Sequence, residues 1–276
     1  MYADLYIMRF HTNLHAGAMG DGFSIVDKQV QRDPASELPT IHASSLKGAL
    51  RAFAESAQLP RDQVEGIFGQ ELPKNGTPKQ GSARFLPAQL LLYPLRTSTR
   101  PYLLGTCPSM LNTLLEYAAI GGIEGGIVEA AKRALQNAPK QGTALLLAAN
   151  GVTVSAMSVE TLTVEKGSDA SLAPLCAGPL LLLHDEDMSA LCKELPILAR
   201  NCLENGLSGN LWYEEVVPRE SVFCSLVLGE KREDMQVLRK TLCAPNTYVQ
   251  IGANATLGYG LCSMQVYARE GGQIHG

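Results

Sequence analysis

Ser44-Ser45-Leu46-Lys47-Gly48-Ala49-Leu50-Arg51 opens the helix that this sequence predicts most clearly. The apolar residues of this stretch and of the next six positions are spaced to lie on one face of a helix: Leu46, Ala49, Leu50, Phe53 and Ala57. Ser44 or Ser45 is a favourable N-cap, and Pro60 is expected to stop the helix. Lys47 and Gly48 break two local rules, because a cation in the first turn opposes the helix dipole and glycine weakens a helix. Such violations tend to mark functional sites.

The chemistry of this helix start suits an anion. Free backbone N–H groups, the hydroxyls of Ser44 and Ser45 and the ammonium of Lys47 can together bind a phosphate. Arg51 lies one turn further along and can join them. A capped helix with a solvated lysine is the alternative, and the spacing alone leaves it open.

The chain before this helix is rich in glycine. The segment Leu14-His15-Ala16-Gly17-Ala18-Met19-Gly20-Asp21-Gly22 follows an opening with the pattern of a β-strand, and such a loop lets backbone approach a ligand closely. It leads to Asp27, which stands between apolar residues and a mixed polar stretch. Asp27 is therefore interpreted as a catalytic carboxylate or as a solvated turn residue.

A second glycine-rich segment lies near the C-terminus. The stretch Gln250-Ile251-Gly252-Ala253-Asn254-Ala255-Thr256-Leu257-Gly258-Tyr259-Gly260 joins two segments with the pattern of β-strands. It has neither the GxGxxG spacing of a dinucleotide fold nor the lysine of a P-loop, so neither NAD nor ATP is predicted. A loop that binds a nucleic-acid backbone and an ordinary glycine-rich hairpin both fit this composition.

The composition indicates an α+β protein with local rather than global binding chemistry. Short β-rich segments alternate with helical segments of modest length over 276 residues. The chain has 23 basic and 27 acidic residues, a net charge of −4, which argues against binding nucleic acid by bulk electrostatics. The seven cysteines are scattered without the spacing of zinc or redox motifs, so reduced thiols are expected.

No membrane association is predicted. The longest apolar runs, such as Ala144 to Ala149 and Pro179 to Leu183, are too short to cross a bilayer. The N-terminus has no basic region, long apolar stretch or cleavage site, so it is read as a first strand and not as a signal peptide. A cytoplasmic location is expected.

Three segments occur in an order that resembles the RAMP superfamily. In that superfamily a ferredoxin-like core, related to RNA-recognition motifs, carries an N-terminal loop, a serine-lysine-glycine helix start and a C-terminal glycine-rich loop. In this sequence, the stretches that resemble these three segments are His15-Ala16-Gly17, Ser44 to Arg51 and Gly252 to Gly260. The resemblance implies an α+β, ferredoxin-like (RRM-like) RAMP core with inserted segments, in a single domain over residues 1–276.

Within the superfamily, two stretches resemble the backbone subunit of the type III-B CRISPR effector complex, the Cmr complex. They are Ile25 to Arg32 and Leu211 to Phe223, and Ala88 to Arg96 and Thr106 to Pro108 are similar too, so the resemblance covers most of the chain. The backbone subunit of the related type III-A Csm complex is the alternative. The family implies a protruding β-hairpin thumb, expected at about residues 198–212, where Gly206 and Gly209 give a hairpin signal.

The resemblance also implies an activity. Copies of such a subunit stack along the CRISPR RNA guide with other Cmr subunits, and each cleaves the paired target RNA, so that the cuts fall at regular intervals. Asp27 matches the family's catalytic aspartate and is expected to hold a divalent metal, Mg²⁺ or Mn²⁺, or to accept a proton. His15 is a candidate acid or base, and Glu215 a candidate to assist the metal or the nucleophile. Binding of RNA is expected from Ser44, Ser45, Lys47 and Arg51 at the helix start and from Gly252, Asn254, Thr256, Gly258 and Tyr259 in the glycine-rich loop.

Two other functions remain compatible with these residues. The first is a purely architectural RNA-binding subunit in which Asp27 is not used for cleavage. The second is an endonuclease of the same superfamily that processes the guide precursor with histidine-centred acid–base chemistry. The acidic net charge and the stretch Trp212-Tyr213-Glu214-Glu215 favour the backbone subunit.

Overall fold

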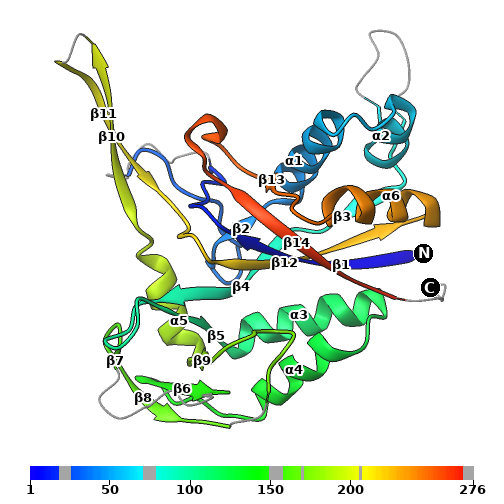
Figure 1. The fold of residues 1–276 in the computed structure, drawn as a ribbon. Helices are drawn as coiled ribbons and strands as arrows, with labels where there is room; N and C mark the ends of the chain where they lie inside the picture. Colours follow the sequence, from blue (N-terminus) through cyan, green and yellow to red (C-terminus); the bar gives the residue numbers. More distant parts are fainter. Residues whose placement is uncertain (19–25, 71–78, 149–157, 169–170, 205–206, 270–276) are drawn as a thin grey trace.

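A four-stranded antiparallel sheet forms the centre of the molecule (Figure 1). The computed structural model describes residues 1–18, 26–70, 79–148, 158–168, 171–204 and 207–269. The central strands, in spatial order, are β14 (Leu261–Ala268), β1 (Tyr2–Phe10), β12 (Val222–Gly229) and β4 (Ala88–Leu95). The first strand of the chain thus lies between the third and the fourth, with a helix after β1 and another after β12. This is the ferredoxin-like βαββαβ arrangement, and it confirms the predicted fold class.

Helices cover both faces of this sheet (Figure 1). One face carries α1 (Ala43–Ser56), α2 (Arg61–Phe68) and α6 (Arg232–Leu242), and the other carries α3 (Pro108–Gly121) and α4 (Gly126–Leu135). Two clusters of buried apolar side chains fill the two layers. Because both faces of β1 and β12 are covered, these strands are almost continuously apolar and do not alternate with polar residues.

Helix α1 begins differently from the prediction. Its N-cap is His42, which makes no side-chain capping hydrogen bond, so the prediction of Ser44 or Ser45 as N-cap was wrong. The reason is a tertiary contact: the side-chain oxygen of Gln31 accepts the His42 N–H at 2.7 Å and fixes the chain entering the helix. Both serines therefore lie in the first turn. The buried face includes Ala54 in place of the predicted Ala57, which is exposed at the helix end.

A long insertion separates β4 from β12 and extends the sheet beyond β4 (Figure 1). Its elements, besides α3 and α4, are β5 (Leu103–Thr106), β6 (Thr143–Leu147), β7 (Ser158–Val159), β8 (Leu162–Lys166), β9 (Leu180–Leu182) and α5 (Asp185–Lys193). Four short elements complete the core: β2 (Thr40–Ile41), β3 (Ala83–Phe85), β13 (Val249–Gln250) and the 3₁₀ turn η1 (Ala255–Leu257). No helix in the described parts of the chain is long and apolar enough to span a bilayer.

A two-stranded hairpin projects from the body of the molecule (Figure 1). Its strands are β10 (Ile197–Glu204) and β11 (Leu207–Glu215), and they pair only with each other within the described sheets. The predicted hairpin of residues 198–212 falls on these strands, while residues 205 and 206 lie outside the described ranges. Trp212 and Glu214 are more buried than their neighbours Leu211 and Tyr213, so one face of the hairpin turns toward the body and the other toward solvent.

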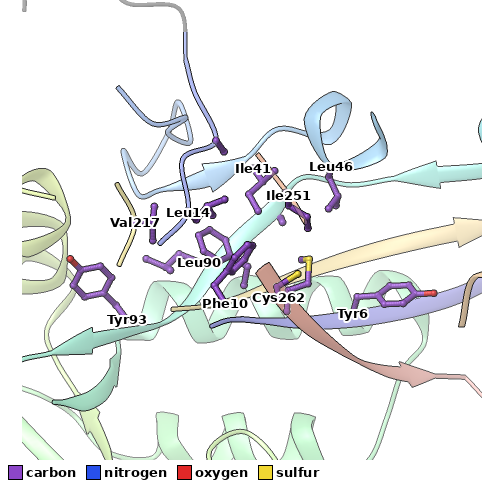
Figure 2. Close-up of a cluster of buried hydrophobic side chains, with 14 of the residues drawn as sticks. Tyr6, Phe10, Leu14, Ile41, Leu46, Leu90, Tyr93, Val217, Ile251 and Cys262 are labelled. Atoms are coloured by element: carbon purple, nitrogen blue, oxygen red, sulfur yellow. The ribbon is translucent and has the colours of Figure 1, made fainter. Parts of the chain in front are cut away.

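The loops at one end of the central sheet are anchored in the core. Leu14, Val217 and Ile251 come from three such loops and lie close together among the buried side chains (Figure 2). They are 1%, 2% and 0% exposed. Each loop is thereby fixed by an apolar side chain below it, which leaves its polar residues to face one another above the core.

Candidate functional site

Three backbone segments meet at the base of the hairpin. The segment around Leu14 pairs with Val217, and Gly17 pairs with Val30. Lys28 pairs with Glu214 at the end of β11, where its N–H donates to the Tyr213 carbonyl at 3.1 Å. The predicted N-terminal loop and the segment of Asp27 are thus joined to the hairpin by main-chain hydrogen bonds, although the hairpin lies about two hundred residues further along the chain.

Asp27 is an exposed carboxylate held at this junction. Its Oδ2 atom accepts a hydrogen bond from the Tyr213 N–H at 2.7 Å. The neighbouring side chain of Lys28 extends over the Trp212 ring, with Nζ 5.2 Å from the ring centroid. The structure therefore gives Asp27 a fixed position at the root of the hairpin while leaving its side chain accessible.

Glu215 has a different environment from the predicted one. Its residue is 7% exposed, and its two carboxylate oxygens accept hydrogen bonds from the Val30 N–H at 3.0 Å and from Arg32 Nη2 at 2.5 Å. Arg32 also donates to the carbonyl of Cys192 at 2.8 Å. Because both oxygens are engaged, Glu215 joins the Asp27 segment to the hairpin and to the end of α5, and its predicted help to a metal or nucleophile is not supported by this geometry.

His15 is enclosed by the same network. It is 4% exposed, and its Nδ1 lies 2.7 Å from the Glu215 carbonyl oxygen and 3.6 Å from Glu214 Oε1. A carbonyl oxygen only accepts, so Nδ1 carries the hydrogen of that bond. An imidazole closed off from solvent cannot contact a substrate phosphate in this arrangement. In this structure His15 positions its neighbours, and its acid–base role stays a prediction.

The C-terminal glycine-rich segment folds over the His15 loop. It connects β13 to β14, as predicted, and the Ala253 N–H donates to the His15 carbonyl at 2.9 Å. Gly252 has φ +88°, and a Cβ there would lie 2.6 Å from the same carbonyl oxygen. Gly258 also has a positive φ, +76°, but no atom lies within 4 Å of its Cβ position. Gly252 therefore allows close packing of the loop against His15, whereas the backbone at Gly258 has open space beside it.

The remaining predicted residues of this segment divide into two kinds. Asn254 and Tyr259 face the hairpin: Asn254 Nδ2 donates to Glu214 Oε1, and the Tyr259 ring centroid lies 5.9 Å from the guanidinium carbon of Arg200. Thr256 is exposed in the turn η1. Thr256 and Gly258 are thus the members of the predicted set that remain available to a ligand.

The start of α1 lies beside this loop system. Gln31 is 7% exposed, and its Nε2 donates to the Gly17 carbonyl at 3.0 Å and to Ser45 Oγ at 2.9 Å. Ser45 is therefore occupied in holding the N-terminal loop. Ser44 is exposed and Lys47 is half-buried.

Ser44 and Lys47 line a hollow of about 520 Å³ between the start of α1, the end of α2 and β3. Other residues that line it include Lys79, Arg84, Phe85 and Glu230. Phe85 stacks on Phe68 with ring centroids 5.3 Å apart, and Arg84 pairs with Glu230 at 3.1 Å. Three cations and one carboxylate give this hollow a positive charge that suits a polyanion.

Arg51 does not line this hollow with Lys47. Its guanidinium donates to Glu55 Oε1 at 2.9 Å and to the Gly69 carbonyl at 3.0 Å. These bonds tie α1 to the end of α2, so Arg51 supports the wall of the hollow from behind rather than joining the helix start.

A match to the RAMP superfamily covers residues 8–263, which is most of the sequence. The chain belongs to the RAMP superfamily. The matched range includes the helix start, the glycine-rich loop and most of the ferredoxin-like core of this RAMP chain, from the end of β1 to the start of β14.

Individual relatives agree with this placement. The CRISPR system Cmr endoribonuclease Cmr4 of Pyrococcus furiosus is 27% identical in an alignment of 270 positions that covers 90% of each chain. A chain of the type III-B Cmr-beta complex bound to cognate target RNA superposes with a TM-score of 0.79 and 23% identity, covering 96% of this chain and 97% of that one. Oligomeric Cmr4 from Pyrococcus furiosus superposes with a TM-score of 0.70 and 20% identity, covering 98% of this chain and 100% of that one. The two structures establish that the fold is shared along the whole chain.

The described carboxylates of this RAMP chain do not form a preformed metal cage. Among the described residues, no group of three or more His, Cys, Asp or Glu side chains is arranged to hold a metal ion. Within the part of the chain that the structure describes, Asp27 is the accessible carboxylate at the hairpin root, since the oxygens of Glu215 are occupied. That donor set fits Mg²⁺ or Mn²⁺ bound by one carboxylate together with substrate phosphate and water, a common arrangement for Mg²⁺.

Several residues that build the site were not predicted as site residues. Gln31, Arg32, Arg200 and Glu214 make the hydrogen bonds that join its segments. Their sequence positions carried one weak signal: Gln31 and Arg32 are polar residues that directly follow the buried Val30. The contacts themselves bridge up to about two hundred positions, which local spacing does not report.

Proposed function

We propose that this chain is a backbone subunit of a type III-B CRISPR effector complex in the cytoplasm, which binds the guide RNA and cleaves the complementary target RNA. The observation that carries the proposal is the accessible carboxylate of Asp27, fixed by the Tyr213 N–H at the root of a projecting hairpin. The naming of the Pyrococcus relative as a Cmr endoribonuclease supports the activity. The complex with target RNA and the oligomeric structure support target RNA, other Cmr subunits and further copies of the chain as partners.

The RNA path is proposed to run over the positive hollow and the open part of the glycine-rich loop. Lys47, Lys79 and Arg84 provide charge for backbone phosphates, and the exposed Ser44 adds a hydroxyl. Gly258 leaves space for close approach of a backbone. The negative net charge of the chain is compatible with this path because these three cations lie together at the hollow.

Cleavage is proposed to use the nucleophile that RNA already contains. The 2′-oxygen attacks the adjacent phosphorus, the bond from phosphorus to the 5′-oxygen breaks, and the products carry a 2′,3′-cyclic phosphate and a 5′-hydroxyl. Asp27 Oδ2 is held by Tyr213, and the other oxygen, which has no partner among the described residues, is proposed to accept the 2′-hydroxyl proton or to bind a metal. A divalent metal held by Asp27 and the RNA phosphate would neutralise developing negative charge.

The test is cleavage of an end-labelled RNA complementary to the guide by the assembled complex, with Asp27 or Asp27→Asn, in Mg²⁺ and after chelation with EDTA. Asparagine can still accept the Tyr213 hydrogen bond, so the fold and RNA binding should persist. The expected result is a regular ladder with cyclic-phosphate ends, lost in the variant and in EDTA and restored by Mg²⁺. An undiminished ladder from Asp27→Asn would exclude Asp27, and a wild-type complex that binds target without cutting would leave the architectural function. Cleavage that survives EDTA would remove the metal from the proposal.

A further inference from the structure

Glu214 is an almost fully buried carboxylate that the catalytic proposal does not use. It is 1% exposed, although it lies at the root of the projecting hairpin. Its Oε2 accepts a hydrogen bond from Arg200 Nη1 at 2.9 Å, and its Oε1 accepts one from Asn254 Nδ2. His15 Nδ1 lies 3.6 Å from Oε1. A carboxylate this deeply buried is costly to desolvate, so its bonds to the surrounding donors hold it firmly in place.

The partners of Glu214 belong to three different parts of the chain. Arg200 lies on the opposite strand of the hairpin, Asn254 lies in the glycine-rich loop, and His15 lies in the N-terminal loop. Asn254 adopts a left-handed backbone conformation, φ 62°, which turns the start of η1 toward the hairpin. One side chain therefore ties the hairpin to both loops that surround the site.

Aromatic contacts extend the same connection. The guanidinium carbon of Arg200 lies 5.6 Å from the Trp212 ring centroid and 5.9 Å from the Tyr259 ring centroid. Trp212 belongs to the hairpin and Tyr259 to the glycine-rich loop, so Arg200 contacts rings on both sides while it holds Glu214. Without the carboxylate, the guanidinium would lose its charged hydrogen-bond partner and keep its contacts with the two rings.

The connection reaches Asp27 through the backbone. Asp27 Oδ2 is held by the N–H of Tyr213, the residue directly before Glu214. The Glu215 N–H on the other side of Glu214 donates to the Lys28 carbonyl at 2.8 Å. A rotation of the hairpin about its root must therefore move Asp27 with it, relative to the glycine-rich loop and the start of α1.

We propose that Glu214 is a positioning residue that couples the hairpin to the glycine-rich loop and thereby determines where along the target RNA Asp27 cuts. The predicted effect on RNA cleavage rests on the proposed function. The coupling of the hairpin to the glycine-rich loop within the protein does not depend on it. Loss of the carboxylate leaves the hairpin free to pivot, so the Asp27 carboxylate samples several phosphates instead of one. At each phosphate the carboxylate is then less well aligned, and a misplacement of about 1 Å can lower a rate on the order of 100-fold.

The matched control is a second buried carboxylate in the same chain. Asp4 is 0% exposed and is bonded to Arg239 Nε at 2.8 Å and Nη2 at 2.5 Å, near the opposite end of β1 from the site. Asp4→Asn therefore removes a comparable buried charge and tests whether general destabilisation explains any effect. Glu214→Ala, Asn254→Ala and Asp27→Asn complete the set.

Two measurements decide the proposal. The first is the position of each cut, mapped to single nucleotides in complexes assembled well below the unfolding temperature of every variant. The second is acrylamide quenching of Trp212, the one tryptophan of the sequence, in the isolated full-length chain. Glu214→Ala and Asn254→Ala should each spread every cut over neighbouring nucleotides, slow cleavage by roughly 10- to 100-fold and raise quenching. In Asp4→Asn, the cuts should stay at single nucleotides and the quenching of Trp212 should equal that of the wild type.

Sharp cuts at wild-type positions in Glu214→Ala would overturn the proposal, as would equal broadening in Asp4→Asn. Unchanged quenching in Glu214→Ala would overturn the coupling itself. A ladder that persists in Asp27→Asn would refute the role of Asp27 in the proposed function instead, and the Trp212 measurement would still decide whether Glu214 holds the hairpin.

Discussion

Gly252→Ala should destabilise the protein far more than Gly258→Ala, although both glycines have positive φ in the same loop. A non-glycine residue in the left-handed region costs about 1–2 kcal/mol, and both variants incur this cost. At Gly252 the new Cβ would also lie 2.6 Å from the His15 carbonyl oxygen and 3.1 Å from its carbonyl carbon. Overpacking of this kind costs about 1–3 kcal/mol, so the expected loss is about 2–5 kcal/mol. Gly258 has no atom within 4 Å of the Cβ position, so its loss should remain about 1–2 kcal/mol.

Urea unfolding of the isolated chain, followed by far-UV circular dichroism, measures this difference. Part of the loss at Gly252 should come from the hydrogen bond of the Ala253 N–H to the His15 carbonyl, 2.9 Å, which weakens as the loop moves away. The comparison isolates the close approach because the backbone strain is shared. Equal free energies of unfolding for the two variants would refute the conclusion that Gly252 is required by contact with the His15 loop.

Three further outcomes are expected. Lys47→Gln and Arg84→Gln should each weaken guide RNA binding and lower the slope of log affinity against log salt by about one, measured by filter binding, and an unchanged slope would remove that residue from the RNA path. Exposed Cys202 should react with iodoacetamide before Cys224, because burial raises the pKa of the Cys224 thiol to about 12, and peptide mass spectrometry of the native chain would show the reverse order if this is incorrect. Asp33 should contribute to acid sensitivity: burial opposes its ionisation, but hydrogen bonds from Ser36 and Ala35 hold its pKa below the ordinary 3.8, so its contribution is present above that pH and is lost as the pH falls through the lowered value. Asp33→Asn should flatten the dependence of unfolding free energy on pH in that range, and an unaltered slope would contradict this reasoning.

The sequence predicted those parts of the fold that depend on local pattern. The strand at Tyr2–Phe10, the helix over Leu46 and Leu50, and the glycine-rich connection between two strands are all present. Each rests on periodicity or on glycine placement within a few residues. The helix boundary was missed because its cause, the Gln31 side chain bonded to the His42 N–H, is a tertiary contact.

The candidate site was predictable in its segments but not in its division of roles. His15 and Glu215 have the residue types of catalysis, and only their burial, 4% and 7%, shows that they hold other groups in place. The environment of Glu214 combines residues near positions 15, 200 and 254, and no local spacing connects these. A single sequence reports which groups are capable of chemistry, whereas exposure decides which of them can reach a substrate.

The adjacent acidic residues of β11 are both engaged within the protein, which is why Asp27 is the carboxylate proposed for catalysis. Successive side chains of a strand point to opposite faces, so Glu214 and Glu215 cannot turn toward the same phosphate. Glu214 is bonded to Arg200 and Asn254 on one face, and Glu215 is bonded to Arg32 on the other. The backbone N–H groups of Tyr213 and Glu215 hold the Asp27 carboxylate and the Lys28 carbonyl at the edge of the strand. If Asp27 binds a metal as proposed, no second carboxylate of the described residues is placed to join it, so the metal must take most of its ligands from RNA and water, and its affinity should be low until target RNA is bound.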